Sequence, residues 1–497
     1  MSTEPNIRLH NTASGSEEPF EPYGLPVKMY VCGLTPKDEP HLGHARQFVV
    51  KDMVRRYLTF RGYPVRYVQN FTDIDDKIIA AGLREGIAPA VAAKRYTESY
   101  FRELDRLNVL RADEYTYVTE YIARIIEMIS GLIADGHAYA EENGDVFFSV
   151  PSFPAYGKLS GRDSETLSNE ARIDPDERKH DPRDFALWKA AKPGEPWWES
   201  PWGKGRPGWH IECSTMALHA LGKQIDIHGG GTDLIFPHHE NEIAQSESYT
   251  GKHPFVKYWV HSGLLNLSGD KMAHSGEFMT ITTVLDEDRI PAPALRTYLL
   301  SQHYRTIITW SEEQLQAIIT RWRRWVDARA NLNRLIDWAA GPIVGAVDAA
   351  VADALATAHE AFITAMDDDL NTSVAMAVLD DLVRAANTYI GTITGDEPTP
   401  EALGTLLAAR DSIDSLADIL GIELVEEEDE GSALSADDVS AIEDLVGQRT
   451  AARAVKNWAE ADRIRKVLLD GYDVEVKDTP QGPTWSVRAT VGERGER

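Results

Sequence analysis

The sequence of 497 residues has only two cysteines, Cys32 and Cys213. A single disulfide closing so long a loop would be an unusual way to stabilise a large cytosolic chain. We therefore expect both residues to be free thiols that serve chemistry.

Long apolar runs are also lacking. No segment has 18 uninterrupted apolar residues, and residues 1–22 are polar and acidic, without a basic start followed by an apolar stretch. We expect a soluble, cytoplasmic protein without membrane contact, in which residues 1–22 form a disordered tail.

Lysine is scarce, with 17 lysines among the 51 basic residues, and 79 acidic residues give a net charge of -28. Such a surface repels itself at low salt, which leads to the hypothesis of salt adaptation. Unchanged stability between dilute buffer and molar KCl would contradict it. A strongly acidic chain is also not an obvious partner for nucleic acid.

Apolar strands and a helical pattern alternate in the first third of the chain. Residues 27–32 and 65–71 read as strands around a helix at 42–60, which is the order of a βαβ unit with a parallel sheet. Strands at 224–228 and 256–260 would complete a Rossmann-like doubly wound α/β sheet.

Changes in composition predict the remaining organisation. Residues 113–206 are rich in Pro, Gly and Trp, as in an insertion; residues beyond Pro291 have helical periodicity; and the acidic run 426–431 reads as a linker. The expected units are a tail (1–22), two halves of the nucleotide-binding fold (23–112 and 207–265), an insertion (113–206), a loop region (266–315), a helix bundle (316–425), a linker (426–438) and a C-terminal module (439–490).

The tetrad His41-Leu42-Gly43-His44 lies between the first strand and its helix. Free backbone N–H groups and the helix dipole favour phosphate there, and two histidines can donate hydrogen bonds to it. Gly43 would let a flat base approach the backbone. Four residues alone are equally compatible with two ordinary surface histidines.

A second element, Lys271-Met272-Ala273-His274-Ser275, follows Ser268-Gly269-Asp270 and is expected in a mobile loop. A cation in such a loop could close over a triphosphate.

Together these elements resemble the HIGH and KMSKS signatures of class I aminoacyl-tRNA synthetases, in the right order and at about the expected separation. Two further runs, Gly208–Ser214 and Asp226–Glu242, closely resemble cysteinyl-tRNA synthetases, and the resemblance extends from Tyr30 to residues 449–453 and 458–465. It implies a monomer that activates L-cysteine with ATP and Mg²⁺ and transfers it to tRNA(Cys). Residues 266–315 would then be the KMSKS-like loop and stem-contact region, and 439–490 an anticodon-binding module.

The same resemblance implies one zinc ion held by Cys32, Cys213, His238 and Glu242. His238 and Glu242 are four apart, so on a helix they project from one face, and two thiolates, an imidazole and a carboxylate make a plausible zinc set. Without the resemblance, the cysteines would read as small buried hydrophobes. Zinc explains how cysteine is told from serine, because a thiolate is a far better ligand than a hydroxyl. We therefore expect no editing domain.

Other residues are candidates for substrate contact. Thr72 follows the second strand, the Asp233 carboxylate can pair with the cysteine ammonium, and Trp209 and His228 can wall the pocket; alternatively, Thr72 is a cap and Trp209 is core.

His41 and His44 would stabilise the α-phosphate. Lys271 would neutralise pyrophosphate. The sequence departs from KMSKS at Ala273 and at His274, which replaces the second lysine and titrates near neutrality.

Positive charge gathers in the part of the chain that the resemblance assigns to tRNA. The candidates are Arg321, Arg323, Arg324, Arg329 and Arg334 in one helical stretch, and Arg449, Arg453, Lys456, Arg463, Arg465 and Lys466 around Trp458. Arginine that only confers solubility is the alternative.

Two rival functions stay open on the sequence. One is a ligase that passes cysteine from the same adenylate to an amino sugar; such relatives lack the C-terminal module. The other is a non-catalytic tRNA-binding paralogue, suggested by the altered Lys271 loop.

Overall fold

The computed structural model describes residues 6–162, 178–267, 279–338, 347–393, 398–425, 436–454, 456–472, 474–479 and 482–487. The chain divides into two compact units, Met1–Ile281 with Ala292–Leu424, and Thr282–Pro291 with Val425–Arg497. The first contains a parallel sheet, an inserted antiparallel sheet and a helix bundle.

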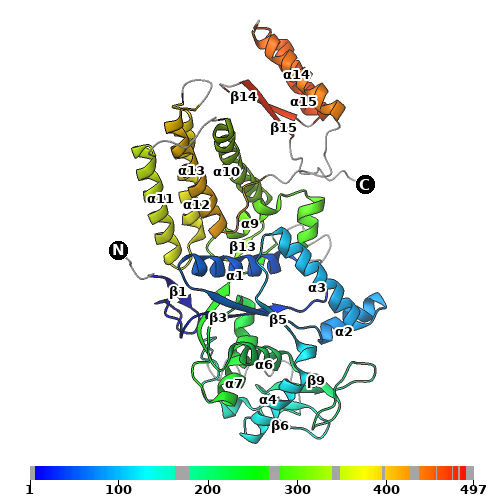
Figure 1. Ribbon diagram of the computed structural model, residues 1–497. Helices are drawn as coiled ribbons and strands as arrows, with labels where there is room; N and C mark the ends of the chain where they lie inside the picture. Colours follow the sequence, from blue (N-terminus) through cyan, green and yellow to red (C-terminus); the bar gives the residue numbers. More distant parts are fainter. Residues whose placement is uncertain are drawn as a thin grey trace. The chain divides into compact units, whose positions relative to one another are not determined.

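A five-stranded parallel sheet in the order β11-β10-β3-β4-β5 forms the centre of the first unit (Figure 1). Its inner strands are mostly buried, because helices cover both faces. The doubly wound sheet predicted from the sequence is confirmed. The strands are β3 (Val27–Leu34), β4 (Val65–Phe71), β5 (Glu114–Tyr117), β10 (Ile225–Gly231) and β11 (Val256–Ser262).

Helix α1 (Leu42–Phe60) lies on one face of the sheet, and α6 (Trp209–Leu221) and α7 (Glu240–Thr250) lie on the other (Figure 1). The predicted bounds of α1 hold because His41 caps its start and Gly62, with φ of 86°, follows its end. Between β4 and β5 lie α2 (Asp76–Glu85) and α3 (Pro89–Arg106).

The insertion begins later than the predicted residue 113. Val68–Phe71 of β4 pair with Glu114–Tyr117, so β5 belongs to the central sheet. Its sequence, EYTY, has no apolar run that would predict this. The insertion then consists of α4 (Ile122–Ala134) and an antiparallel sheet of β6 (Ala138–Ala140), β7 (Val146–Phe148), β8 (Phe185–Ala190) and β9 (Gly205–Pro207).

The prediction of a disordered tail is wrong for residues 6–22. Strands β1 (Arg8–Asn11) and β2 (Ser16–Pro19) form a hairpin. The Asn11 side chain accepts a hydrogen bond from the Trp259 amide (3.0 Å) and donates one to the Lys257 carbonyl (2.9 Å). These contacts with β11 hold the segment together with the buried side chains of Ile7, Leu9 and Phe20.

A helix bundle follows the parallel sheet (Figure 1). It buries a core that includes Trp322, Trp325 and Phe362, and it begins at Glu312 rather than at 316. Its helices are α10 (Glu312–Trp338), α11 (Ala349–Asp367), α12 (Thr372–Ile390) and α13 (Pro400–Ile419). Before it come β12 (Leu265–Asn266), α9 (Ala292–Leu300) and β13 (Ile308–Thr309).

The second unit contains α14 (Ala436–Ala454), α15 (Trp458–Tyr472), β14 (Val474–Thr479) and β15 (Gly482–Val487). The strands pair as an antiparallel hairpin, and Ile442, Ile464 and Leu468 lie in a small core. Of the helices in the described parts, none is long and apolar enough to span a membrane.

Candidate active site and metal centre

A cavity of about 520 Å³ opens at the carboxyl end of the parallel sheet. It lies where the strand order reverses, with β3 leading through α1 to β4 on one side and β10 on the other. Ligands of doubly wound sheets bind at such a point. Gly33, His41, His44, Gly231 and Asp233 are among the residues that line it.

His41 and His44 stand at the start of α1, beside this cavity. Nδ1 of His41 accepts a hydrogen bond from the Gly43 amide (3.1 Å), and Nδ1 of His44 accepts one from the His41 amide (3.3 Å). Burial lowers the pKa of His41 to about 4 and that of His44 well below its usual value. Each neutral ring that accepts at Nδ1 carries its proton on Nε2, so Nε2–H is the donor group through which each ring can bind a phosphate.

Gly43 has a second reason to be glycine besides access for a base. A Cβ there would lie 2.9 Å from Cε1 of His41. The His41 and His44 rings stack with centroids 3.6 Å apart, so a side chain at Gly43 would displace the ring that caps the helix.

Cys32, Cys213, His238 and Glu242 converge in a buried cluster from β3, α6, the turn before α7, and α7. Their ligand atoms all lie within 4.8 Å of one another. The Cys32 and Cys213 sulfurs are 3.7 Å apart, Cys32 Sγ is 3.4 Å from Glu242 Oε1, and His238 Nε2 is 3.0 Å from the same oxygen. Four ligands at zinc distances of about 2.0 to 2.3 Å form a tetrahedron with edges of about 3.3 to 3.8 Å. The cluster therefore has suitable donors and spacing for zinc.

The charges of this cluster depend on one another. A hydrogen bond from Cys32 lowers the pKa of Cys213 to about 6, whereas burial raises the pKa of Cys32. Burial alone would lower the pKa of His238, but Cys213 and Glu242 raise it to about 10. Protonated His238 balances only one of the two buried negative charges, those of Cys213 and Glu242, and the remaining charge is a further reason to expect a metal here.

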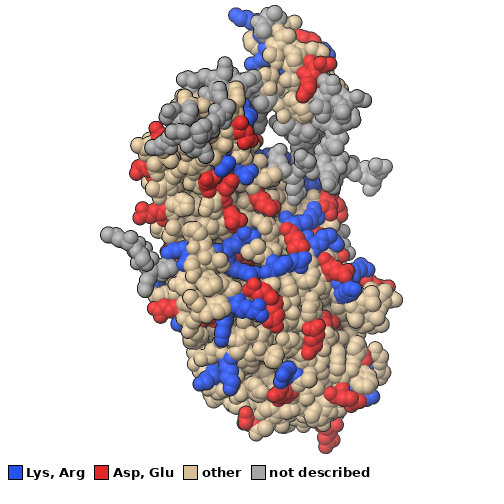
Figure 2. Space-filling view, viewed as in Figure 1, with Lys and Arg blue, Asp and Glu red and all other residues tan. Residues whose placement is uncertain are grey.

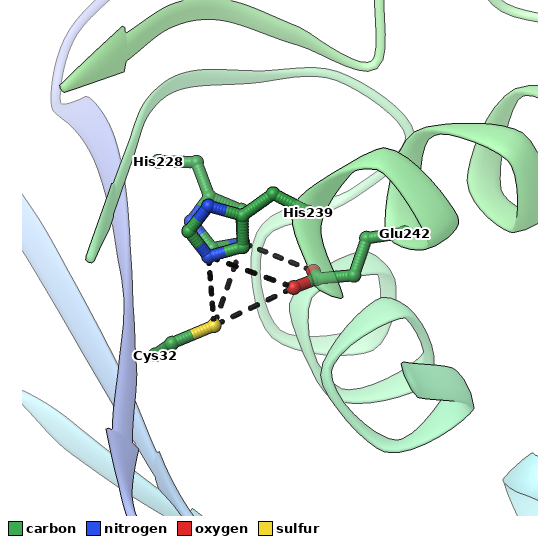
Figure 3. Close-up of side chains that lie close together, drawn as sticks. All are labelled: Cys32, His228, His239 and Glu242. Carbon is green, nitrogen blue, oxygen red and sulfur yellow. Dashed lines mark hydrogen bonds and ion pairs between the residues drawn. The ribbon is translucent and has the colours of Figure 1, made fainter. Parts of the chain in front are cut away.

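Figure 3 shows a second group, in which His228 and His239 join Cys32 and Glu242. His228 Nε2 is 3.0 Å from Glu242 Oε2, and His239 Nε2 is 3.3 Å from Cys32 Sγ. Because Cys32 and Glu242 belong to both groups, the two sets compete for one metal position.

His239 had no predicted role, although its neighbour His238 did. Its Nδ1 lies 2.7 Å from Nε2 of His261, whose Nδ1 lies 2.7 Å from the Thr12 hydroxyl. The adjacent pair His238-His239 was the available signal for a role of His239. Its contacts could not be predicted, because His261 lies on β11 and Thr12 lies in the N-terminal hairpin.

The four candidate cysteine-contact residues do not share one cavity. Asp233 is exposed and lines the 520 Å³ cavity, whereas Trp209 lines a neighbouring cavity of about 710 Å³. The Trp209 ring lies 4.3 Å from that of His238, and the Thr72 hydroxyl donates to Glu212 (3.2 Å). His228 is buried and stacks on Trp259. Trp209 and His228 thus contact members of the cluster, and Thr72 bonds to Glu212, the residue before Cys213. Asp233 lines the cavity that also contains His41 and His44.

Comparison with known proteins decides the family. The model of class I (C) tRNA synthetase catalytic domains matches residues 21–320, and that of the DALR domain matches residues 361–425. A cysteine–tRNA ligase from Heliobacterium modesticaldum is 47% identical over 97% of this chain and 99% of its own, and one from Trichlorobacter lovleyi is 44% identical over 97% and 100%. The chain belongs to the cysteine–tRNA ligase family.

Solved structures agree on the fold of this cysteine–tRNA ligase family member. Methionyl-tRNA synthetase from Mycobacterium tuberculosis, solved with methionyl-adenylate, superposes with a TM-score of 0.61 at 17% identity, covering 80% of this chain and 91% of that one. At that identity the likeness concerns the fold alone. In this family member, Lys271 and His274 of the KMSKS-like loop lie outside the described residues.

The tRNA-contact candidates of this family member lie in different environments. Arg324 is exposed, but Arg321 pairs with Asp380 (2.7 Å) and Arg463 with Glu460 (2.7 Å). In the C-terminal module, Arg453 lies over the exposed Trp458 ring and Arg465 is exposed.

Arg449 requires a correction. Only 3% of it is exposed. Its guanidinium is therefore not offered to a phosphate on the surface, and we withdraw it as a tRNA contact.

Proposed function

We propose that the chain joins L-cysteine to the 3′ end of tRNA(Cys), using ATP and Mg²⁺ and passing through cysteinyl-adenylate. The main observation in support is a buried cluster beside the cavity that His41 and His44 line; the cluster consists of Cys32, Cys213, His238 and Glu242. A soft donor set next to a phosphate-binding helix start suits a reaction between a thiol-bearing amino acid and a nucleotide.

We assign zinc to Cys32, Cys213, His238 and Glu242. When bound, zinc supplies a soft Lewis acid that accepts a thiolate far better than a hydroxyl, which separates cysteine from serine. The first of the two competing groups is favoured because its two sulfur donors suit zinc better than the one sulfur of the second.

The chain's own residues bind and orient the reactants. The Nε2–H groups of His41 and His44 donate to the α-phosphate as its charge develops, and the Asp233 carboxylate accepts from the cysteine ammonium. Trp209, Thr72 and His228 shape the pocket around the thiol. These contacts position the reactants, which accounts for most of the catalysis in such a reaction.

The roles of Lys271 and His274 in nucleotide binding rest on the sequence resemblance alone. Lys271 neutralises the departing pyrophosphate, and His274 assists when the phosphates keep it protonated.

The bundle and the C-terminal module bind the tRNA. Arg324, Arg465 and the Arg453–Trp458 pair offer exposed charge and an aromatic face to phosphates and unstacked bases. Figure 2 shows Lys and Arg side chains interleaved with carboxylates on the face in view, despite the net charge of -28. Binding therefore depends on local groups of cations, and Arg321 and Arg463 must exchange their carboxylate partners to take part.

The comparisons favour neither rival function, and the altered Lys271 loop is the one feature that suggests the non-catalytic paralogue. The curated relatives match along nearly their whole length, including the region of the C-terminal module that an amino-sugar ligase lacks. The cytoplasmic location, the monomeric state and the salt adaptation stay predictions.

Cysteine-dependent exchange of pyrophosphate into ATP, with serine as the control substrate, tests the first half of the proposal. Exchange with cysteine and not with serine, followed by charging of tRNA in the same buffer, is expected. Exchange without charging would point to a different acceptor, and no exchange in either dilute or molar KCl would contradict the proposal.

A further inference from the structure

Arg296 of α9 is completely buried, yet its guanidinium bonds to three separate segments. Nε donates to the Leu420 carbonyl (2.8 Å), Nη1 to the carbonyls of Leu107 (2.8 Å) and Asn108 (3.0 Å), and Nη2 to Asp52 Oδ2 (2.5 Å). The bundle end, the loop after α3 and helix α1 therefore meet at one side chain.

The three segments that Arg296 joins are also bonded to one another. Asp52 accepts from Nε of Arg56 (2.8 Å) and from the Leu110 amide (3.0 Å), and the Asn108 side chain donates to the Gly421 carbonyl (3.0 Å). Planar guanidinium groups suit such a network because their N–H donors point in fixed directions.

Gly421 is shaped to receive the guanidinium. Its φ is +66°, and a Cβ on it would lie 2.3 Å from Nη2 and 2.5 Å from Cζ of Arg296. The end of α13 thus approaches Arg296 so closely that only glycine fits at this position.

The network joins two functionally different places in the first unit. Asp52 lies on α1, whose first turn carries His44 and is capped by His41. Leu420 and Gly421 end the bundle, and the chain reaches the C-terminal module soon after them. Arg296 thereby fixes the bundle's last turn to the helix that carries the proposed phosphate-binding histidines.

We propose that Arg296 is a positioning residue for transfer of cysteine to tRNA, and this rests on the proposed function. Arg296 holds the end of the bundle against α1. It thereby determines the position that the 3′ end of a tRNA bound to the bundle takes relative to the adenylate. Misplacement of about 1 Å far from the chemistry can cost a reaction roughly 100-fold in rate. Formation of the adenylate needs no tRNA and therefore does not depend on the position of the bundle relative to α1.

Stabilisation alone is a weak explanation of the network. A buried ion pair adds little net stability compared with well-packed apolar groups of the same size, because both charges lose their hydration. What an arginine with an aspartate and three carbonyls supplies is a defined geometry between segments.

Arg296→Lys is the first test, because lysine keeps the charge facing Asp52 and loses the forked bonds to Leu420 and Leu107. Asn108→Ala removes the bond to Gly421 and a bond from Arg56, and it strains a left-handed backbone with φ of 52°. It therefore disturbs the contact between the loop after α3 and the end of the bundle. Phe362→Leu in the bundle core is the control, since it lowers stability and makes none of these hydrogen bonds.

Two rates are measured per active site: cysteine-dependent pyrophosphate exchange, and single-turnover transfer from preformed adenylate to tRNA. For Arg296→Lys and Asn108→Ala we expect the rate of exchange to stay within about 2-fold of that of the unmodified protein, and the rate of transfer to fall about 10-fold or more. Phe362→Leu should leave the ratio of the exchange rate to the transfer rate unchanged. Equal losses of both rates, or no loss of transfer, would overturn the inference. If the unmodified protein makes adenylate but charges no tRNA, the proposed function fails instead.

Discussion

The sulfur atoms of Cys32 and Cys213 lie 3.7 Å apart, although 181 positions separate the two residues in the sequence. β3 and the first turns of α6 bring them together in the interior of the first unit. The only two thiols of the chain thus meet at one buried point, with His238 and Glu242 beside them.

Metal analysis of single variants separates the two competing groups of ligands. We expect the unmodified protein to hold one zinc ion per chain, and Cys213→Ser and His238→Gln to retain less than about a tenth of it, because each variant would lose a proposed ligand. His239→Gln should keep its zinc. The measurement is zinc per chain by mass spectrometry after dialysis. Loss of zinc from His239→Gln, with retention in Cys213→Ser, would assign the metal to the group in Figure 3.

Substitution of Asp233 should affect one substrate and not the other. Asp233→Asn would remove the proposed charged hydrogen bond to the cysteine ammonium. Such a bond is worth about 1.5 to 3 kcal/mol, so the KM for cysteine should rise roughly 10-fold to 100-fold. The KM for ATP should stay nearly constant. Asp38→Asn removes the same charge from a residue lining the same cavity and is the matched control. A similar rise in the KM for cysteine in both variants would show a general charge effect.

Acid should weaken the fold through the helix cap. The folded pKa of His41 is about 4, below the usual 6.5, so the unfolded state binds more protons between these two pH values. The free energy of unfolding therefore falls as pH drops from 6.5 toward 4. His41→Asn keeps a good N-cap without this titration, and its urea-unfolding free energy should fall less steeply over that range. Identical slopes in the two proteins would rule out His41 as a source of the pH dependence.

Two glycines with nearly the same φ should respond differently to alanine. Gly86 has φ of +68°, and a Cβ added to it would meet no atom within 4 Å, whereas at Gly421 the Arg296 guanidinium already occupies the place of a Cβ. Gly86→Ala should cost about 1 kcal/mol of unfolding free energy. Gly421→Ala should cost at least about 2 kcal/mol, because steric overlap adds to the backbone strain. Equal costs, measured by urea unfolding, would contradict the close packing at Gly421.

Much of the fold follows from local patterns in the sequence. Apolar runs locate β3, β4, β10 and β11, and the change from Pro40 to a capped helix locates α1. β5 escaped prediction because an edge strand needs few apolar residues, and the N-terminal hairpin escaped because Asn11 gains its hydrogen-bond partners on β11 only after folding.

The site could be predicted only in part. The four zinc candidates follow from family resemblance, and the structure brings them together. The only local signal for His239 is its neighbour His238, and Arg296 has none, because the partners of both residues come from distant segments. The burial of Arg449 also gives no signal in the sequence. Local chemistry can be read from sequence, whereas long-range contacts require the fold.

The central claim is tested most directly by incubating the purified protein with ATP, Mg²⁺, labelled cysteine and total tRNA. We expect label bound to tRNA through an alkali-labile ester, and none when serine replaces cysteine. Label that remains as adenylate and never reaches tRNA would contradict the account, as would charging with serine at a comparable rate.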